Sequence, residues 1–177
     1  MRTQGADAAW ILEPVRTEDA LPPILELDRA AFKMPWSREM FTSALASPGE
    51  FFLFALRAVD DPSLAGFICY RVAVGVLQIA TIAIRHDLRR SGLGSKLVQF
   101  ALAQGFAEGA REATLEVRVS NVPARRLYEH LGFMPVAVQY GYYHSPTEDA
   151  LLYWRPCHDR GEIGYCEPSS LWPRSAS

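Results

Sequence analysis

The chain has 177 residues, of which 49% are hydrophobic and 21% are charged, and its formal net charge is -2 at pH 7. This length suits one compact domain. The near balance of 18 basic and 20 acidic residues provides no overall field that would attract nucleic acid or an anionic membrane. The first ten residues lack the apolar core of a signal peptide, and the longest apolar stretch, at 72–84, is too short to span a bilayer. We therefore expect a cytoplasmic protein with no nucleic-acid or membrane partner.

The three cysteines are too few for a disulfide scaffold and are odd in number. They are Cys69, Cys157 and Cys166. Their spacing does not match a zinc knuckle, and His158 beside Cys157 does not complete a ligand set. We expect free thiols in a reducing compartment and no bound metal.

The N-terminal part of the domain contains short elements separated by prolines. A strand is expected at 10–15, followed by a helix that starts near Pro22 and ends near Phe32. Ser37 is placed to cap a second helix that runs to about Ala46. The expected division of the whole chain is a disordered start, a domain and an irregular tail, at 1–9, 10–155 and 156–177.

Three β-rich runs follow, at 51–58, 65–74 and 77–84. Asp60, Asp61 and Pro62 are expected to form the first turn, and Gly75 is expected to form the second. Because both connections are short, we expect an antiparallel meander.

A long helix at 93–107 then connects the third run to a strand at 113–120. Apolar side chains cover most of the circumference of this helix, which indicates packing on a sheet. A helical crossover of this kind makes the two strands that it joins parallel. A further helix should begin after the N-cap residue Asn121 and end before Gly132. Two strands close the domain, at 133–140 and 149–154.

The segment RRSGLG at 89–94, between the third run and the long helix, has the composition of an anion-binding site. Free backbone N–H groups and the helix dipole converge at such a junction, and two glycines let a ligand approach the backbone. The two arginines add charge that a pyrophosphate would use. The segment fits neither the Walker A pattern nor the dinucleotide-binding glycine pattern. The alternative to an anion-binding site is a glycine-rich turn whose arginines are solvated.

RRSGLG at this junction resembles the acetyl-CoA pyrophosphate loop of the GNAT N-acetyltransferases. Other stretches are similar to the RimI-type ribosomal-protein-alanine N-acetyltransferases of that family: MPWSREMF at 34–41, LEVRVSN at 115–121, LYEHLGF at 127–133, GYY at 141–143 and EDALLY at 148–153. The similarity covers residues 10–154, which is nearly the whole domain.

The resemblance implies an α/β fold of the GNAT type: a mixed, mostly antiparallel sheet in which two central parallel strands splay apart, with flanking helices. It also implies that acetyl-CoA binds in the gap between these strands and that no metal is needed. The residues assigned to the cofactor are Ile82, Ala83, Ile84, Arg89, Arg90, Ser91, Gly92, Leu93, Gly94, Ser95 and Asn121.

The strand TLEVRVSN contains Glu116, which has two possible roles: a catalytic base or a member of an ion pair. Leu115, Val117 and Val119 are expected to face the core, whereas Glu116 and Arg118 share the other face. Glu116 matches the position of the family's catalytic base, which takes a proton from the attacking amine. The alternative is an ion pair between Glu116 and Arg118, which would make Glu116 a poorer base.

Tyr128 matches the position of the family's acid, which protonates the departing thiolate. Its spacing relative to Ala124, Leu127 and Leu131 is also that of a core aromatic residue, and a tyrosine can serve in both ways. Asn121 is expected to cap a helix, with a cofactor contact as an additional role.

Tyr142 and Tyr143 are expected on a link between the last two strands, where GYY resembles the peptide-facing hairpin of the alanine acetyltransferases. We assign them to the acceptor site. The expected reaction is direct attack in a ternary complex, which moves acetyl from acetyl-CoA to the N-terminal amine of a protein, with a small-subunit ribosomal protein that begins with alanine as the candidate. The alternatives are acetylation of a lysine or a small-molecule amine, and a CoA-binding module without turnover.

Overall fold

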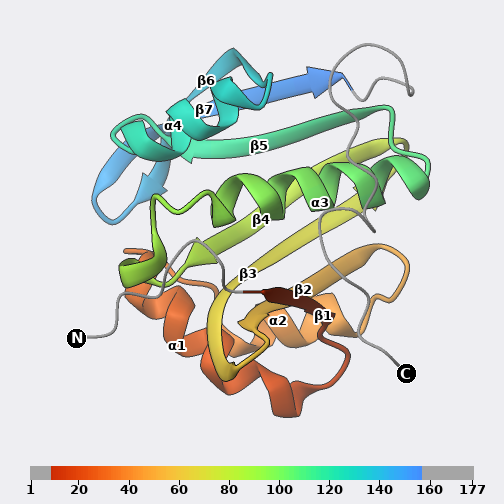
Figure 1. The fold of residues 1–177 in the computed structure, drawn as a ribbon. Coiled ribbons are helices and arrows are strands. Elements are labelled where there is room, and N and C mark those ends of the chain that lie inside the picture. Colours follow the sequence, from red (N-terminus) through yellow and green to blue (C-terminus); the bar gives the residue numbers. More distant parts are fainter. Residues whose placement is uncertain (1–8, 157–177) are drawn as a thin grey trace.

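A seven-stranded mixed sheet, in the order β1-β2-β3-β4-β5-β7-β6, runs through the protein (Figure 1). The structure is a computed structural model and describes residues 9–156. The strands are β1 (Trp10–Pro14), β2 (Phe51–Ala58), β3 (Asp61–Ala73), β4 (Val76–Ile84), β5 (Glu112–Arg118), β6 (Met134–His144) and β7 (Thr147–Pro156). The helices are α1 (Leu21–Ala31), α2 (Arg38–Leu45), α3 (Leu93–Ala107) and α4 (Val122–His130), with short 3-10 helices η1 (Glu18–Ala20) and η2 (His86–Leu88).

The disordered start and the irregular tail that the sequence predicts fall almost wholly outside the described residues. Pro156 is a correction, because it is the last residue of β7 and not part of a tail. Cys157, His158 and Cys166 lie outside the described range. Within that range, no helix is both long enough and apolar enough to cross a bilayer.

The first four strands pair as the predicted antiparallel meander. The turn between β2 and β3 is formed by Val59 and Asp60 and not by residues 60–62, because β3 already begins at Asp61. Two irregularities in the β2–β3 pairing accommodate Pro62, which has no N–H to donate to the neighbouring strand.

β4 and β5 are parallel, as the helical crossover predicts, and they separate after a short contact. Residues 76–78 of β4 pair with residues 112–114 of β5. β5 pairs with β7 along its whole length on its other edge, so beyond residue 114 the edge that faces β4 has no partner strand. A β-bulge at Ala80 lies directly beyond the last paired residues: Tyr70 of β3 pairs with Ile79, and Cys69 pairs with Thr81. This confirms the splayed parallel strands that the resemblance implied.

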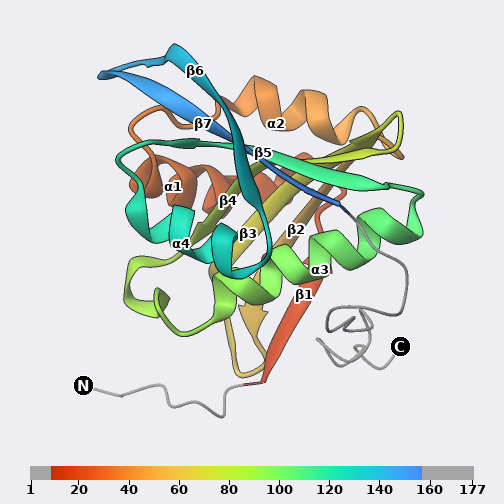
Figure 2. The same cartoon turned by 90° about the horizontal axis from the view of Figure 1, so that it is seen from above.

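Helices cover both faces of the sheet, with α3 and α4 on one face and α1 and α2 on the other (Figures 1 and 2). The bulge at Ala80 divides β4 between the two hydrophobic cores. Ile79 packs in the core beneath α3, whereas Ala83 packs in the core beneath α1 and α2. Ile79 and Ala83 are four residues apart and would face the same layer in a regular strand. The bulge places them on opposite faces of the sheet.

β6 and β7 form one long antiparallel hairpin, and both strands exceed their predicted lengths. β6 continues to His144, so Tyr142 and Tyr143 lie within a strand and not on a link. Gly141 takes a positive φ of 62° inside β6, within an irregularity in the pairing with β7. The glycine therefore bends the strand without ending it.

Val119 is also a correction. β5 ends at Arg118, and Val119 is 37% exposed, whereas Leu115 and Val117 are buried as predicted. The chain turns after Arg118 to enter α4, so the alternation of the strand does not extend to Val119.

Gly66 of β3 gives a test of how closely β3 and β4 approach beside the gap. A Cβ added at Gly66 would lie 2.8 Å from the carbonyl oxygen of Ala83 and 2.6 Å from Cδ1 of Ile84. The backbone oxygen cannot retreat without disturbing the β3–β4 pairing. We expect Gly66→Ala to lower the free energy of unfolding by about 1–3 kcal/mol, measured by urea denaturation. An unchanged denaturation midpoint would contradict this packing.

Candidate active site

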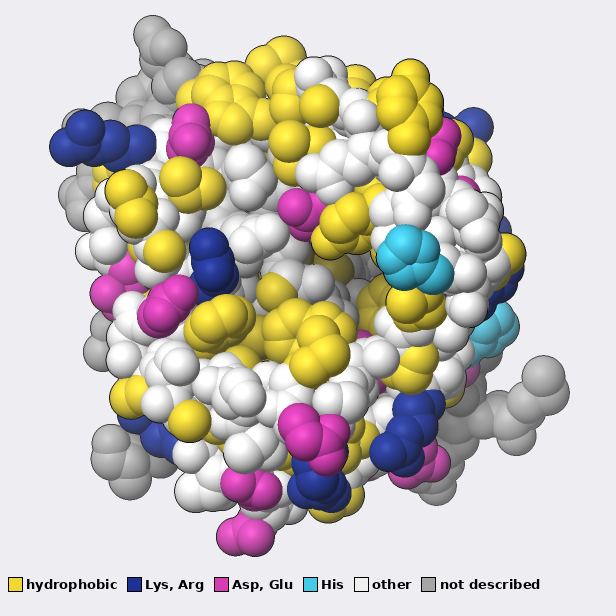
Figure 3. Space-filling view, turned by 180° about the vertical axis from the view of Figure 1, so that it is seen from behind, with side chains coloured by type: hydrophobic (Ala, Val, Ile, Leu, Met, Phe, Trp, Pro, Cys, Tyr) yellow, Lys and Arg dark blue, Asp and Glu magenta, His cyan; other side chains and the backbone are white. Residues whose placement is uncertain are grey.

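A cavity of about 250 Å³ lies where β4 and β5 separate. Figure 3 shows a hollow near the centre of the face opposite α3, with hydrophobic side chains gathered around it. The lining comes from α1 and the loop that follows it, from β4, β5 and β6, and from α4. It includes Asp28, Phe32, Lys33, Met34, Trp36, Ile82, Glu116, Arg118, Asn121, Tyr128, Tyr142 and Tyr143.

Glu116 lies on β5 just beyond the point of separation and is half-buried. Nε2 of Gln78 donates to both of its carboxylate oxygens, at 3.3 and 3.4 Å. Gln78 is the last residue of β4 in register with β5, opposite Thr114, so its amide reaches Glu116 across the narrow end of the gap. The hydrogen bonds orient the carboxylate toward the cavity without neutralising its charge.

Arg118 does not pair with Glu116. Its Nη1 lies 3.1 Å from Oε2 of Glu148 on β7, and its guanidinium carbon lies 3.9 Å from the ring centre of Tyr143. The alternative weighed from the sequence, an ion pair between Glu116 and Arg118, is therefore not the arrangement in the structure. Among the described residues, no basic side chain forms an ion pair with Glu116.

Tyr128 has the features of a core aromatic residue and also reaches the cavity. It is 7% exposed, and its ring packs against Phe133 and Tyr153 with centroid distances of 5.9 and 6.3 Å. Burial, with a smaller contribution from Tyr143, raises the pKa of Tyr128, so its hydroxyl stays protonated near neutral pH. A protonated hydroxyl on the cavity wall can donate a hydrogen bond or a proton.

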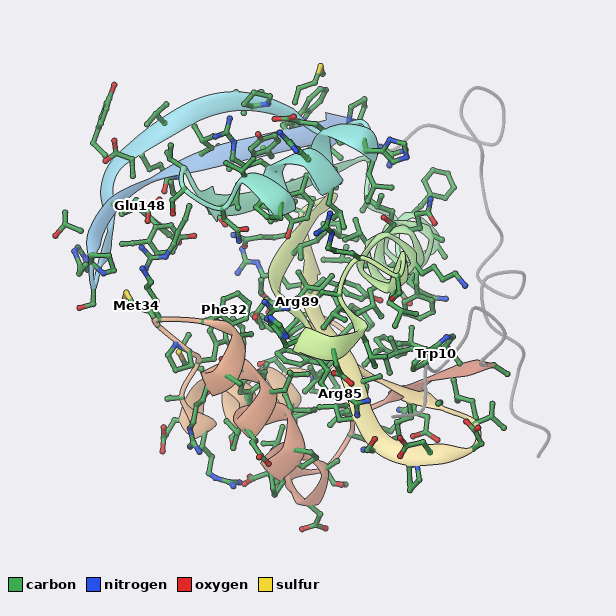
Figure 4. All side chains as sticks on the ribbon, turned by 60° about the vertical axis from the view of Figure 1, so that its left-hand side comes forward. Trp10, Phe32, Met34, Arg85, Arg89 and Glu148 are labelled. Carbon is green, nitrogen blue, oxygen red and sulfur yellow. The ribbon has the colours of Figure 1, made fainter. Side chains whose placement is uncertain are left out.

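A buried carboxylate fastens the loop after α1 to the sheet. Asp28 has no exposed surface; its Oδ2 accepts from the backbone N–H of Trp36 at 2.6 Å, and its Oδ1 accepts from the hydroxyl of Thr81 at 3.2 Å. The loop from the end of α1 to Trp36 places Phe32 and Met34 at the cavity, across from the end of the β6–β7 hairpin (Figure 4).

Asp28 should give the protein a pH-dependent stability. Burial raises the pKa of Asp28, against the lowering effect of its hydrogen bonds to Trp36 and Thr81. The folded protein therefore holds this proton more tightly than the unfolded chain, so the stability from Asp28 is present at low pH and is lost as the pH rises through the raised value. We expect the free energy of unfolding of the wild type, relative to that of Asp28→Asn, to fall as the pH rises above about 4, the value of an ordinary aspartate. Urea titrations at several pH values measure this difference, and a constant difference would contradict the prediction.

The RRSGLG segment lies at the start of α3. Gly92 is the N-cap with a φ of 85°, and Arg90 has a φ of 65°, so both adopt the left-handed conformation. The first helical hydrogen bond runs from the N–H of Lys96 to the oxygen of Gly92, at 3.1 Å. The preceding N–H groups therefore point out of the helix end, as in anion-binding sites. A Cβ at Gly94 would lie 3.1 Å from Cδ1 of Leu127, so this glycine also lets α4 approach.

The arginines near this segment differ in their contacts. Nε of Arg89 donates to the carbonyl oxygen of Ile84 at 3.1 Å, which ties the segment to the end of β4. Arg85 pairs with Asp87 at 2.8 Å. Figure 4 labels Arg85 and Arg89 beside the connection between β4 and α3. Arg90 is exposed.

Asn121 and the end of β4 complete the set of predicted residues. Oδ1 of Asn121 accepts from the N–H of Ala124 at 3.3 Å, which confirms the predicted cap of α4. Residues 82–84 pair with β3 on one side and have no β5 partner on the other, so this edge of their backbone faces the gap. Six of the fifteen predicted site residues therefore line one cavity: Ile82, Glu116, Asn121, Tyr128, Tyr142 and Tyr143. Ala83, Ile84, Ser95 and the RRSGLG segment lie outside its lining.

Comparison with known proteins agrees with this geometry. The acetyltransferase (GNAT) family matches residues 21–133, well over half of the chain. The chain belongs to the GNAT acetyltransferase family.

Relatives of this GNAT protein align over most of its length. A ribosomal protein bS18-alanine N-acetyltransferase of Salmonella typhimurium is 31% identical over 134 residues, which cover 75% of this chain and 88% of the relative. An N-alpha-acetyltransferase of Saccharolobus solfataricus is 32% identical over 168 residues, covering 88% and 96%. The crystal structure of the ribosomal-protein-S18-alanine N-acetyltransferase from Escherichia coli matches with a TM-score of 0.75 and 29% identity, covering 89% of this chain and 99% of that chain.

Three polar residues beside the cavity of this GNAT protein were not singled out by sequence reasoning: Asp28, Gln78 and Glu148. Each contacts a partner far away in the sequence, with separations of 53, 38 and 30 positions for the side-chain hydrogen bonds to Thr81, Glu116 and Arg118. Gln78 could have been noticed in the sequence, because it is a polar residue that interrupts an apolar strand. Glu148 appeared only as part of the EDALLY stretch, and Asp28 left no signal, since their roles depend on which helices and strands pack together.

Proposed function

We propose that this GNAT protein transfers the acetyl group of acetyl-CoA to the α-amine at the N-terminus of a protein, with a small-subunit ribosomal protein that begins with alanine as the candidate acceptor. The observation that carries this proposal is the half-buried Glu116 carboxylate, oriented by Gln78 and not paired with a cation, beside the cavity between the separating strands. Relatives that align over most of the chain are named for this class of reaction.

Acetyl-CoA would lie along the gap between β4 and β5. Its pantetheine arm would pair with the free backbone edge of residues 82–84, and its pyrophosphate would meet the N–H groups at 90–95 with charge from Arg89 and Arg90. The backbone N–H groups near Ile84 would polarise the thioester carbonyl, and Asn121 would add a contact from the other side of the cavity.

Glu116 would act as the base. An α-amine has a pKa of about 8 and a lysine side chain of about 10.4, so a carboxylate deprotonates the α-amine at the smaller cost. As the amine nitrogen bonds to the carbonyl carbon, Glu116 takes one of its protons, directly or through a water molecule. The transfer needs no covalent intermediate with the protein.

Tyr128 would act on the leaving group. When the carbon–sulfur bond breaks, the electron pair goes to sulfur, and the Tyr128 hydroxyl donates its hydrogen bond and then its proton to the CoA thiolate. The buried surroundings that raise the pKa of Tyr128 would also raise the proton affinity of the thiolate, which keeps the transfer feasible. Tyr128 then regains a proton from solvent.

The acceptor peptide would enter between the loop after α1 and the β6–β7 hairpin. Phe32 and Met34 border this entrance on one side, and Tyr142 and Tyr143 border it on the other. Burial is the main cause that raises the pKa of Tyr143 to about 12, so its hydroxyl stays a hydrogen-bond donor for a peptide carbonyl.

A panel of acceptors with labelled acetyl-CoA tests the proposal. The panel contains a peptide with a free N-terminal alanine, the same peptide with a blocked N-terminus and an internal lysine, and a polyamine. We expect transfer to the free α-amine and little transfer to the other two. Transfer to the lysine or the polyamine alone would favour the alternative acceptors, and binding of CoA without any transfer would favour a non-catalytic module.

A further inference from the structure

Arg118 lies close enough to Glu116 to form an ion pair that would weaken Glu116 as the proposed base. It lies two residues from Glu116 on the same face of β5, and residues so spaced along a strand are about 7 Å apart at their backbones. A guanidinium on its flexible stem spans this distance easily. A direct ion pair would hold the Glu116 carboxylate in its charged form and weaken it as a base.

Arg118 is instead held on the β6–β7 hairpin. Nη1 pairs with Oε2 of Glu148 at 3.1 Å, Nη1 and Nη2 donate to the carbonyl oxygens of Pro146 and Ser145 at 3.3 and 3.4 Å, and the guanidinium stacks on the ring of Tyr143. These contacts hold the guanidinium on the hairpin side of the cavity wall, toward the turn of the hairpin, where Figure 4 labels Glu148.

Glu148 is itself fixed in place as an anion. Its Oε1 accepts from the backbone N–H of Ser120 at 2.6 Å, and its hydrogen bonds to Ser120, with the neighbouring Arg118, lower the pKa of Glu148. The side chains of Arg118 and Glu148 are only 16% and 18% exposed, whereas each of the other ion pairs of the described residues has at least one member more than 45% exposed. A pair this sheltered is screened less by salt than the surface pairs.

We propose that Glu148 is a positioning residue that holds Arg118 away from Glu116 and so keeps the Glu116 carboxylate available to take a proton. This inference rests on the proposed function, because it assumes that Glu116 is the base. Glu148 does not line the cavity and acts through Arg118.

The other groups around Glu116 do not replace Arg118 in this role. The ionisable side chains that line the cavity with Glu116 are Asp28, Lys33, Arg118, Tyr128, Tyr142 and Tyr143. Arg118 and Lys33 are the cations among them, and Lys33 is exposed on the loop after α1. Gln78, the direct partner of Glu116, is uncharged. Releasing Arg118 is therefore the change that would bring a sheltered cation to Glu116.

Two variants and their combination test the proposal through acetyl-transfer kinetics. Glu148→Gln keeps an oxygen for the N–H of Ser120 but cannot form the ion pair. We expect it to lower kcat roughly tenfold and to move the acid limb of the pH–rate profile to lower pH, as Arg118 turns toward Glu116. Adding Arg118→Met should then raise kcat above that of Glu148→Gln alone. Glu50→Gln, which removes the exposed pair with Arg71, is the control and should leave kcat unchanged.

A double variant no more active than Glu148→Gln would overturn the proposal, because loss of the hairpin's shape would then explain the defect. A crystal structure of Glu148→Gln gives a readout that needs no turnover. We expect a guanidinium nitrogen of Arg118 within about 4 Å of a Glu116 oxygen, and an Arg118 that stays with the hairpin contradicts the inference. Unimpaired transfer by Glu116→Gln would instead defeat the proposed function, whatever the position of Arg118.

Discussion

Glu116→Gln should lower kcat for N-terminal acetylation by about 100- to 10,000-fold while leaving the affinity for CoA unchanged. A glutamine has nearly the same shape as the glutamate and can still accept a hydrogen bond from the amide of Gln78. It cannot take a proton from the attacking amine at any accessible pH. The expected loss is therefore in the chemical step and not in folding or cofactor binding.

Steady-state kinetics with a peptide acceptor and calorimetric titration with CoA separate these effects. Glu112→Gln is a matched control, because Glu112 also lies on β5 and accepts from the indole N–H of Trp154 at 2.8 Å, away from the cavity. It should keep nearly full activity. A kcat for Glu116→Gln close to that of the wild type would show that another group, or solvent alone, removes the proton.

Tyr128→Phe should lower kcat by about 100-fold, the lower end of the range for a positioned acid. No hydrogen bond within the described residues acts on the Tyr128 hydroxyl, so its loss removes no internal hydrogen bond while the ring remains in the core. We therefore expect the thermal midpoint to change little. The effect should also shrink when acetyl is carried by a thiol that leaves more readily, because such a thiolate needs less help from a proton.

Tyr70→Phe provides the comparison for Tyr128→Phe. Tyr70 is 1% exposed and stacks on Phe52 with a centroid distance of 5.1 Å, outside the cavity lining. Loss of this second buried hydroxyl should leave kcat unchanged. Equal losses of activity in both variants would indicate a general effect of core hydroxyls and would remove the acid role from Tyr128.

The sequence predicts helices and strands well where the local hydrophobic pattern is strong. It predicts the positions of the residues in the cavity wall less well. The bounds of α3 and β2 follow from an almost fully apolar helix and a continuous apolar run, and both match the prediction. The cap by Asn121 also follows from local chemistry. Tyr142 and Tyr143 were misplaced because Gly141 bends β6 without ending it, a distinction that depends on the pairing partner β7.

The partner of Arg118 could not be predicted from the strand alone. In the sequence, Glu116 is the nearest carboxylate on the same strand face, whereas Glu148 is 30 positions away. The outcome depends on β7 being the neighbour of β5 and on the hairpin turn bringing carbonyl oxygens and the ring of Tyr143 to the same guanidinium. Only the order of strands in the sheet decides between the two pairs.

The bulge in β4 and the short contact between β4 and β5 explain why the site forms where it does. The strands share only residues 76–78 and 112–114, and the bulge at Ala80 then redirects β4 toward α1. This leaves a backbone edge without a neighbour on one side of the cavity and Glu116 on the other. The proposed reaction needs both, since one would hold the thioester and the other would take the proton.

A crystal structure with a bisubstrate analogue, in which CoA is linked to the α-amine of a short alanine-first peptide, tests the central claim most directly. We predict that the linked nitrogen lies within hydrogen-bond reach of Glu116, directly or through one water, and that the sulfur lies near the hydroxyl of Tyr128. The peptide should pass between Phe32 and Tyr142. A linked nitrogen remote from Glu116, or a peptide on the α3 face of the sheet, would contradict the proposed site and the reaction assigned to it.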